Sequence, residues 1–110
     1  MPPDGVQLWL VRHGETEWSA AGRHTSTTDL PLTSRGERQA RTLRPLLQRL
    51  APATVMCSPR QRAQQTAKLA GLAVGEVTDD LAEWNYGDYE GLTNAEIRRA
   101  DPDWTIWTAG

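Results

Sequence analysis

Residues 6–16 read VQLWLVRHGET, an apolar run that ends in a turn carrying arginine and histidine. Val6 to Arg12 is apolar nearly throughout, which is typical of a β-strand buried on both faces of a parallel sheet. Gly14 follows directly, and a glycine at this point lets the backbone approach an anion closely. The stretch therefore predicts a buried strand that delivers Arg12 and His13 to the edge of a sheet.

Helix and strand patterns alternate from this stretch toward the C-terminus. Apolar spacing and turn residues predict helices at 34–50, 58–70 and 93–101, strands at 54–57 and 74–77, and loops at 14–32 and 79–91. Such alternation favours an α/β fold, with a mostly parallel sheet in a three-layer α/β/α arrangement.

Individual residues predict where these helices begin and break. Ser34 with Glu37 fits a capping box, and Ser58 is the expected N-cap of the next helix. Pro45 is expected to kink the first helix because it lacks a backbone N–H. Thr93 is the expected cap of the last helix.

Three polar segments follow the expected strand ends, at residues 12–18, 58–62 and 79–91. In open α/β sheets, ligands bind at the carboxyl ends of the strands. We therefore expect these segments to converge on one site. The amino end of the helix after Ser58 would face an anion there.

Composition narrows the class of protein. The 110 residues have a formal net charge of −2, and 38% are hydrophobic, which is typical of one soluble globular domain spanning residues 1–110. No apolar run approaches the roughly 18 residues of a membrane span, and residues 1–4 lack a signal-peptide pattern. The single cysteine, Cys57, excludes an internal disulfide and a cysteine zinc cluster. We expect a cytoplasmic protein that has no membrane partner.

The basic residues do not indicate a nucleic-acid partner. They are almost all arginines, scattered over several predicted elements without a basic run or interleaved aromatic residues. The sequence leaves a homodimer open.

The Arg12-His13-Gly14 string suits phosphoryl transfer. Imidazole is a competent nucleophile at neutral pH, and arginine presents a planar fork of donors to phosphate oxygens. The string alone is weak evidence, because an isolated histidine is more often a structural hydrogen-bonding residue.

The longer pattern resembles the histidine phosphatase superfamily, which has a phosphoglycerate mutase-like fold. RHGET at 12–16 resembles the family signature, and further matching motifs follow in order: Gly22-Arg23 with Asp29-Leu30-Pro31-Leu32-Thr33, Gly36 with Gln39-Ala40, residues 58–67 (SPRQRAQQTA), and Leu81-Ala82-Glu83 with Gly87 and Glu90-Gly91. The overall pattern of motifs most resembles that of broad-specificity bacterial acid phosphatases.

The resemblance implies a role for each matching residue. His13 would take the phosphoryl group, Arg12 and Arg62 would clamp its oxygens, and Glu83 would protonate the leaving oxygen. A small-molecule phosphomonoester is the implied substrate, and no cofactor or metal is implied. Further substrate contacts are expected from Ser19, Arg23, Thr25, Ser26 and Tyr86.

Two departures from the family pattern bear on activity. Ser19 stands where many relatives have asparagine, which shortens or removes a pocket hydrogen bond. The family's second histidine, in a later Ser/Thr-His-Gly motif, is absent, so we expect the chain to be the N-terminal portion of a C-terminally incomplete domain. The leading interpretation is a phosphatase that works through a phosphohistidine at His13. The alternatives are a phosphoglycerate mutase and an inactive phosphate-binding fragment.

Overall fold

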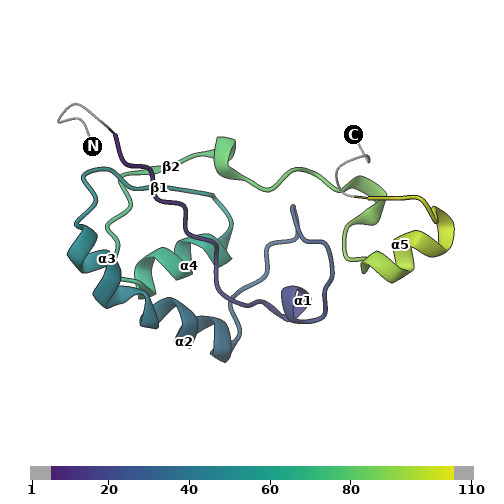
Figure 1. Cartoon of the computed structure of the whole chain (residues 1–110), viewed down its shortest axis with the longest axis horizontal. Helices are drawn as coiled ribbons and strands as arrows, with labels where there is room; N and C mark the ends of the chain where they lie inside the picture. Colours follow the sequence, from purple (N-terminus) through teal and green to yellow (C-terminus); the bar gives the residue numbers. More distant parts are fainter. Residues whose placement is uncertain (1–5, 106–110) are drawn as a thin grey trace.

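The computed structural model describes residues 6–105 of the chain (Figure 1). The elements follow in the order α1 (Glu17–Ala20), α2 (Ser34–Thr42), α3 (Arg44–Leu50), β1 (Met56–Cys57), α4 (Gln61–Leu69), β2 (Glu76–Val77), the 3₁₀ helices η1 (Asp79–Leu81) and η2 (Gly87–Tyr89), and α5 (Asn94–Ala100). The single-domain prediction also covers residues 1–5 and 106–110, which lie outside the described residues.

The sheet confirms the predicted α/β class. Strands β1 and β2 pair in parallel, with Met56 opposite Glu76 and Cys57 opposite Val77. Parallel neighbours need a crossover connection, and α4 supplies it. This helix packs against β1 and α2, and its small residues Ala67 and Ala70 are buried.

The strand expected at residues 6–12 is not formed within the described part of the chain. The segment has no strand assignment, and Val6, Leu8 and Leu10 are 91%, 80% and 84% exposed. An apolar run predicts burial, but a strand also needs a hydrogen-bonded neighbour. The described sheet pairs only β1 with β2, and each has two residues. The prediction that residues 6–12 form a buried strand is therefore wrong for this structure.

Helix boundaries agree with the sequence at Pro45 and at α5. The chain breaks between α2 and α3, where Pro45 occupies the first turn of α3. Thr93 caps α5 in a reciprocal box with Glu96. Two predicted caps are wrong. Thr33, whose hydroxyl accepts from Gly36, caps α2 in place of Ser34, and α4 begins after Arg60 rather than Ser58.

The long loop at residues 14–32 is more ordered than predicted. Thr16 caps the short α1 through a box with Ser19, and Thr16 forms an isolated antiparallel bridge with Leu32. His24 exchanges backbone hydrogen bonds with Gly91 and Leu92. The loop therefore joins the α2–α4 body to the segment around α5.

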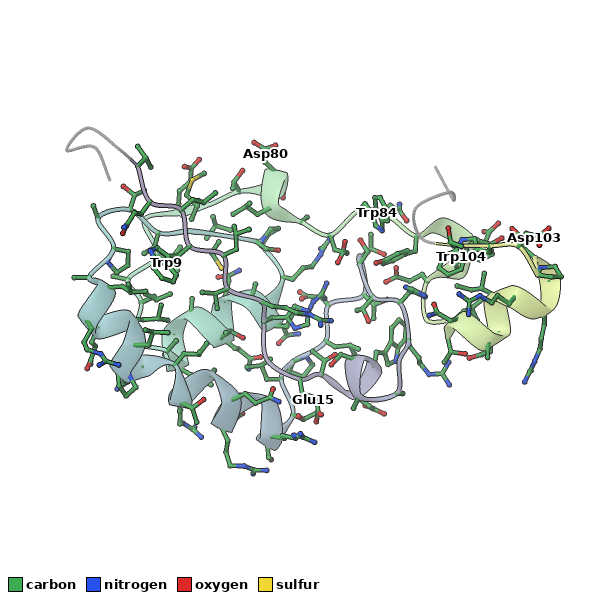
Figure 2. The ribbon with its side chains drawn as sticks, viewed as in Figure 1. Trp9, Glu15, Asp80, Trp84, Asp103 and Trp104 are labelled. Atoms are coloured by element: carbon green, nitrogen blue, oxygen red, sulfur yellow. The ribbon has the colours of Figure 1, made fainter. Side chains whose placement is uncertain are left out.

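Aromatic side chains gather where this loop meets the α5 segment. The ring of His24 lies 4.8 Å from Tyr86 and 5.3 Å from Trp104, centroid to centroid. Figure 2 shows Trp84 and Trp104 at the α5 end of the molecule, with Trp9 far from them near the N-terminus. His24 is half-buried and packs against the rings of Tyr86 and Trp104.

A contact between two glycines sets the distance between the His13 loop and α2. A Cβ added to Gly14 would overlap the backbone carbonyl of Gly36, and one added to Gly36 would overlap the carbonyl of Glu15. Figure 2 shows Glu15 between α1 and α2. Both positions therefore require glycine so that the two backbones can touch.

The substitution Gly36→Ala tests this contact, because the sign of the stability change depends on whether the contact exists. Helix propensity alone would make Gly36→Ala stabilising by about 1 kcal/mol. Because the new Cβ meets backbone, we expect instead a loss of about 1–3 kcal/mol in the free energy of unfolding, measured in urea.

Gly75→Ala is the control, since its Cβ would lie 3.6 Å from the nearest atom, the carbonyl oxygen of Val55. It should cost no stability. A Gly36→Ala protein as stable as the parent would contradict the contact.

Candidate active site

His13 lies half-buried at the end of the N-terminal segment. Its Nδ1 is 2.7 Å from the carbonyl oxygen of Gly14. Because a carbonyl can only accept, Nδ1 carries a proton and donates it. In the neutral ring, the lone pair is therefore on Nε2, the nitrogen available to attack an electrophile.

Neighbouring charges and burial favour the neutral ring. Burial is the largest effect and lowers the pKa of His13 below its ordinary value, while the hydrogen bond to Gly14 opposes it. The positive charges of Arg62 and Arg12 lower the pKa further, and Glu83 raises it. A neutral imidazole with its lone pair free is the form a nucleophile needs.

A buried hydroxyl fixes the turn after His13. The backbone N–H of Gly14 donates to Thr66 Oγ1 at 2.9 Å, and the same hydroxyl donates to the carbonyl of Arg62 at 2.8 Å. Thr66 is 3% exposed. Sequence reasoning missed this role, because the two residues that Thr66 joins lie on different elements.

A hollow of about 210 Å³ opens beside His13, lined by Arg12, His13, Gly14, Glu15, Ser19 and Gln39. Gln39 accepts a hydrogen bond from the N–H of Glu15 and so helps to shape the wall. Ser19 lies in this wall as expected, although its hydroxyl already bonds the backbone of Thr16.

Arg62 is 3% exposed and holds the loop at residues 26–28. Its Nη1 donates to the carbonyl of Thr28 at 2.9 Å and its Nη2 to the carbonyl of Ser26 at 3.1 Å. Burial, followed by the charge of Arg60, lowers the pKa of Arg62. The guanidinium is thus anchored, and its charge still reaches His13.

Glu90 holds the opposite side of the same loop. Its carboxylate accepts the backbone N–H groups of Ser26, at 2.9 and 3.1 Å, and Thr28, at 3.0 Å. Burial alone would raise the pKa of Glu90, but these hydrogen bonds outweigh it and leave the pKa lowered. The sequence motif singled out Glu90, but its partner 64 residues away could not be read from spacing.

Glu83 is exposed, and its carboxylate accepts the N–H of Trp84 at 3.3 Å. Its charge acts on His13 and on Arg62. The structure therefore brings Arg12, His13, Arg62 and Glu83 into one electrostatic neighbourhood.

The other residues predicted as substrate contacts each have protein partners in the structure. Ser26 is 1% exposed, and its hydroxyl donates to the carbonyl of Glu83 at 2.7 Å. Thr25 donates to the carbonyl of Arg23. The guanidinium of Arg23 donates a hydrogen bond to the carbonyl of Gly91 and forms an ion pair with Glu96 at 3.3 Å. Tyr86 packs on His24, and burial raises its pKa.

The amino end of α4 is already occupied by a carboxylate. The N–H of Gln61 donates to Asp29 Oδ1 at 2.7 Å. Asp29 thus supplies the negative charge that this helix end attracts, and the expected anion contact there is not free in this structure.

No group of three or more His, Cys, Asp or Glu side chains within the described residues, 6–105, could hold a metal ion. In the same range, no helix is long and apolar enough to cross a bilayer.

The pKa of His13 can be measured by NMR titration of the ring protons. Because burial and two arginines favour the neutral form, we expect a midpoint below the ordinary 6.5. Arg12→Gln should raise the midpoint and Glu83→Gln should lower it. Arg41→Gln, which removes a pair with Glu37 on α2, should leave it unchanged. A parent midpoint at or above 6.5, or shifts of opposite sign, would contradict this electrostatic account.

Comparisons with known proteins show the family to which the chain belongs. The family model described as histidine phosphatase superfamily (branch 1) matches residues 8–110. An acid phosphatase of Mycobacterium tuberculosis is 55% identical over 106 residues, covering 94% of this chain and 52% of that protein. A sedoheptulose 1,7-bisphosphatase of Saccharomyces cerevisiae is 42% identical, covering 100% and 49%. The chain spans about half the length of these relatives.

Solved structures show the same fold. The structure of a Mycobacterium tuberculosis open reading frame superposes with a TM-score of 0.83 at 56% identity, covering 87% of this chain and 51% of that one. A phosphoglycerate mutase structure from Thermus thermophilus gives 0.64 at 42% identity, covering 74% and 46%. The predicted phosphoglycerate mutase-like α/β fold class is confirmed. The chain belongs to the histidine phosphatase superfamily.

Proposed function

We propose that these residues form the nucleophilic site of a phosphatase that hydrolyses phosphomonoesters through a phosphohistidine on His13. The observation that carries the proposal is the hydrogen bond from Nδ1 of His13 to the carbonyl of Gly14. It leaves the lone pair on Nε2 of His13, a residue that lines the hollow together with Arg12. Relatives named acid phosphatase, bisphosphatase and α-ribazole phosphatase support hydrolysis.

The reaction would have two steps. Nε2 of His13 attacks phosphorus as the bond to the ester oxygen breaks, and the Glu83 carboxyl gives its proton to that leaving oxygen. Water then attacks the phosphohistidine, the nitrogen–phosphorus bond breaks, and Glu83 takes a proton from the water. Phosphate leaves, and both side chains return to their starting states.

The positive charge for this transfer would come from arginine. A loose phosphoryl transition state needs positioning and charge stabilisation more than covalent help. Arg12 and Arg62 are the guanidinium groups whose charge reaches His13. We therefore propose a reaction without a metal cofactor.

Phosphoglycerate mutase chemistry is the second candidate. A probable phosphoglycerate mutase of Serratia proteamaculans is 42% identical over 102 residues, covering 90% of this chain and 47% of that protein. A mutase would pass the phosphoryl group to a second anionic substrate, which requires more positive charge beyond the Glu83 loop. Residues 91–100 offer only Arg98 and Arg99, and Arg98 donates to the carbonyl of Trp104. Water is therefore the favoured acceptor.

The remaining expectations belong to the same proposal. We propose a cytoplasmic enzyme acting on small phosphomonoesters, without a nucleic-acid or membrane partner. A homodimer stays open, as does the inactive phosphate-binding fragment, which the labelling experiment below separates from an enzyme.

Brief incubation with a ³²P-labelled phosphomonoester tests the intermediate. We expect a protein-bound label that is acid-labile and base-stable, as a phosphoramidate is. His13→Ala should abolish the label. His24→Gln should retain it, because His24 packs against Tyr86 and Trp104 and takes no part in the transfer.

The fate of the label separates the candidates. Release as inorganic phosphate into water supports the phosphatase, and transfer to an added phosphoglycerate supports the mutase. Phosphate binding without a covalent label would identify a binding module. Equal labelling of His13→Ala and the parent would contradict the assignment of the nucleophile.

A further inference from the structure

We infer that Ser26 is a positioning residue that sets Glu83 for proton transfer, rather than a substrate contact. The inference rests on the proposed function and names one more residue that its acid step depends on. It begins from the 2.7 Å hydrogen bond that the Ser26 hydroxyl donates to the backbone carbonyl of Glu83.

Burial argues against a direct contact between Ser26 and substrate. The residue is 1% exposed, and each of its polar groups has a protein partner. The N–H donates to Glu90, the carbonyl accepts from Arg62, and the hydroxyl donates to Glu83. A phosphate oxygen could reach this hydroxyl only if one of these bonds broke.

The segment that carries Glu83 needs a hydrogen bond to the body of the protein to hold it in position. Its side chain is exposed, and it lies in an irregular stretch between η1 and η2. The N–H of Trp84 is bonded to the carboxylate of Glu83 itself, so that contact does not fix the stretch to the body of the protein. The Ser26 hydroxyl joins the stretch to a residue 57 positions away.

Ser26 is itself held by the site. Arg62 donates to its carbonyl at 3.1 Å, and Glu90 accepts its N–H at 2.9 Å. The same residue therefore contacts the guanidinium that would clamp the phosphate and the backbone of the acid that would protonate the leaving group. It sets the position of one relative to the other.

The test uses leaving groups of different basicity. An alkoxide needs a proton in the transition state and p-nitrophenolate does not, so misplacing the acid should slow ethyl phosphate selectively. For Ser26→Ala, we expect kcat/KM on ethyl phosphate to fall about 3- to 10-fold, the worth of one hydrogen bond. The value on p-nitrophenyl phosphate should change less than about twofold by the same reasoning.

Four further variants make the result specific. Glu83→Gln should show a larger selective loss, and adding Ser26→Ala to it should cause no further selective loss. Thr27→Ala, an exposed neighbour in the same loop, should keep the parent ratio. If Ser26→Ala disturbs folding, Ser26→Gly, which also lacks the hydroxyl, takes its place and should show the same selective loss on ethyl phosphate.

The outcomes separate this inference from the function beneath it. An equal loss on both substrates, or an unchanged ratio, would overturn the role of Ser26 while Glu83→Gln remains selective. A selective loss that persists in the Glu83→Gln background would show that Ser26 acts through another group. If Glu83→Gln itself lacks selectivity, the proposed acid is wrong and the inference falls with it.

Discussion

One buried hydroxyl, that of Thr66, joins the turn after His13 to the helix that carries Arg62. The hydrogen bonds continue from Arg62 to the carbonyl of Ser26 and from the Ser26 hydroxyl to Glu83. The residues proposed as nucleophile, phosphate clamp and acid are thus connected through protein donors and acceptors. Breaking one buried link leaves its partner unpaired, at a cost of about 1–3 kcal/mol. Mutual placement of the three groups therefore depends on this path.

The charges along this path fit the proposed phosphoryl transfer. Burial and the positive charges of Arg62 and Arg12 lower the pKa of His13, which favours the neutral ring. Glu90, whose pKa is lowered by the loop N–H groups, places a negative charge near Arg62. The guanidinium of Arg62 is held by the backbone carbonyls of Ser26 and Thr28 without any substrate. Groups placed in advance lose little freedom when charge develops on the transferring phosphoryl group.

Local signals in the sequence marked some helix boundaries correctly, although the caps expected at Ser34 and Ser58 lie at Thr33 and Arg60. Pro45 marked the break between α2 and α3, and Thr93 with Glu96 marked the start of α5. Predictions that needed a distant partner were less secure. Residues 6–12 are apolar enough for a buried strand but are unpaired in the described chain.

The candidate site shows the same division between local and distant information. The motifs identified His13, Arg62 and Glu83, and the structure brings them together electrostatically. Ser26 was predicted as a substrate contact because of its place in a motif. Its hydroxyl instead bonds a carbonyl 57 residues away, and no spacing rule within a loop reveals such a contact.

A crystal structure of the protein with vanadate, a mimic of the phosphoryl transition state, tests the central claim most directly. The account predicts vanadium bonded to Nε2 of His13, with oxygens facing Arg12 and Arg62. Vanadate bound through another residue, with Nε2 unligated, would contradict it.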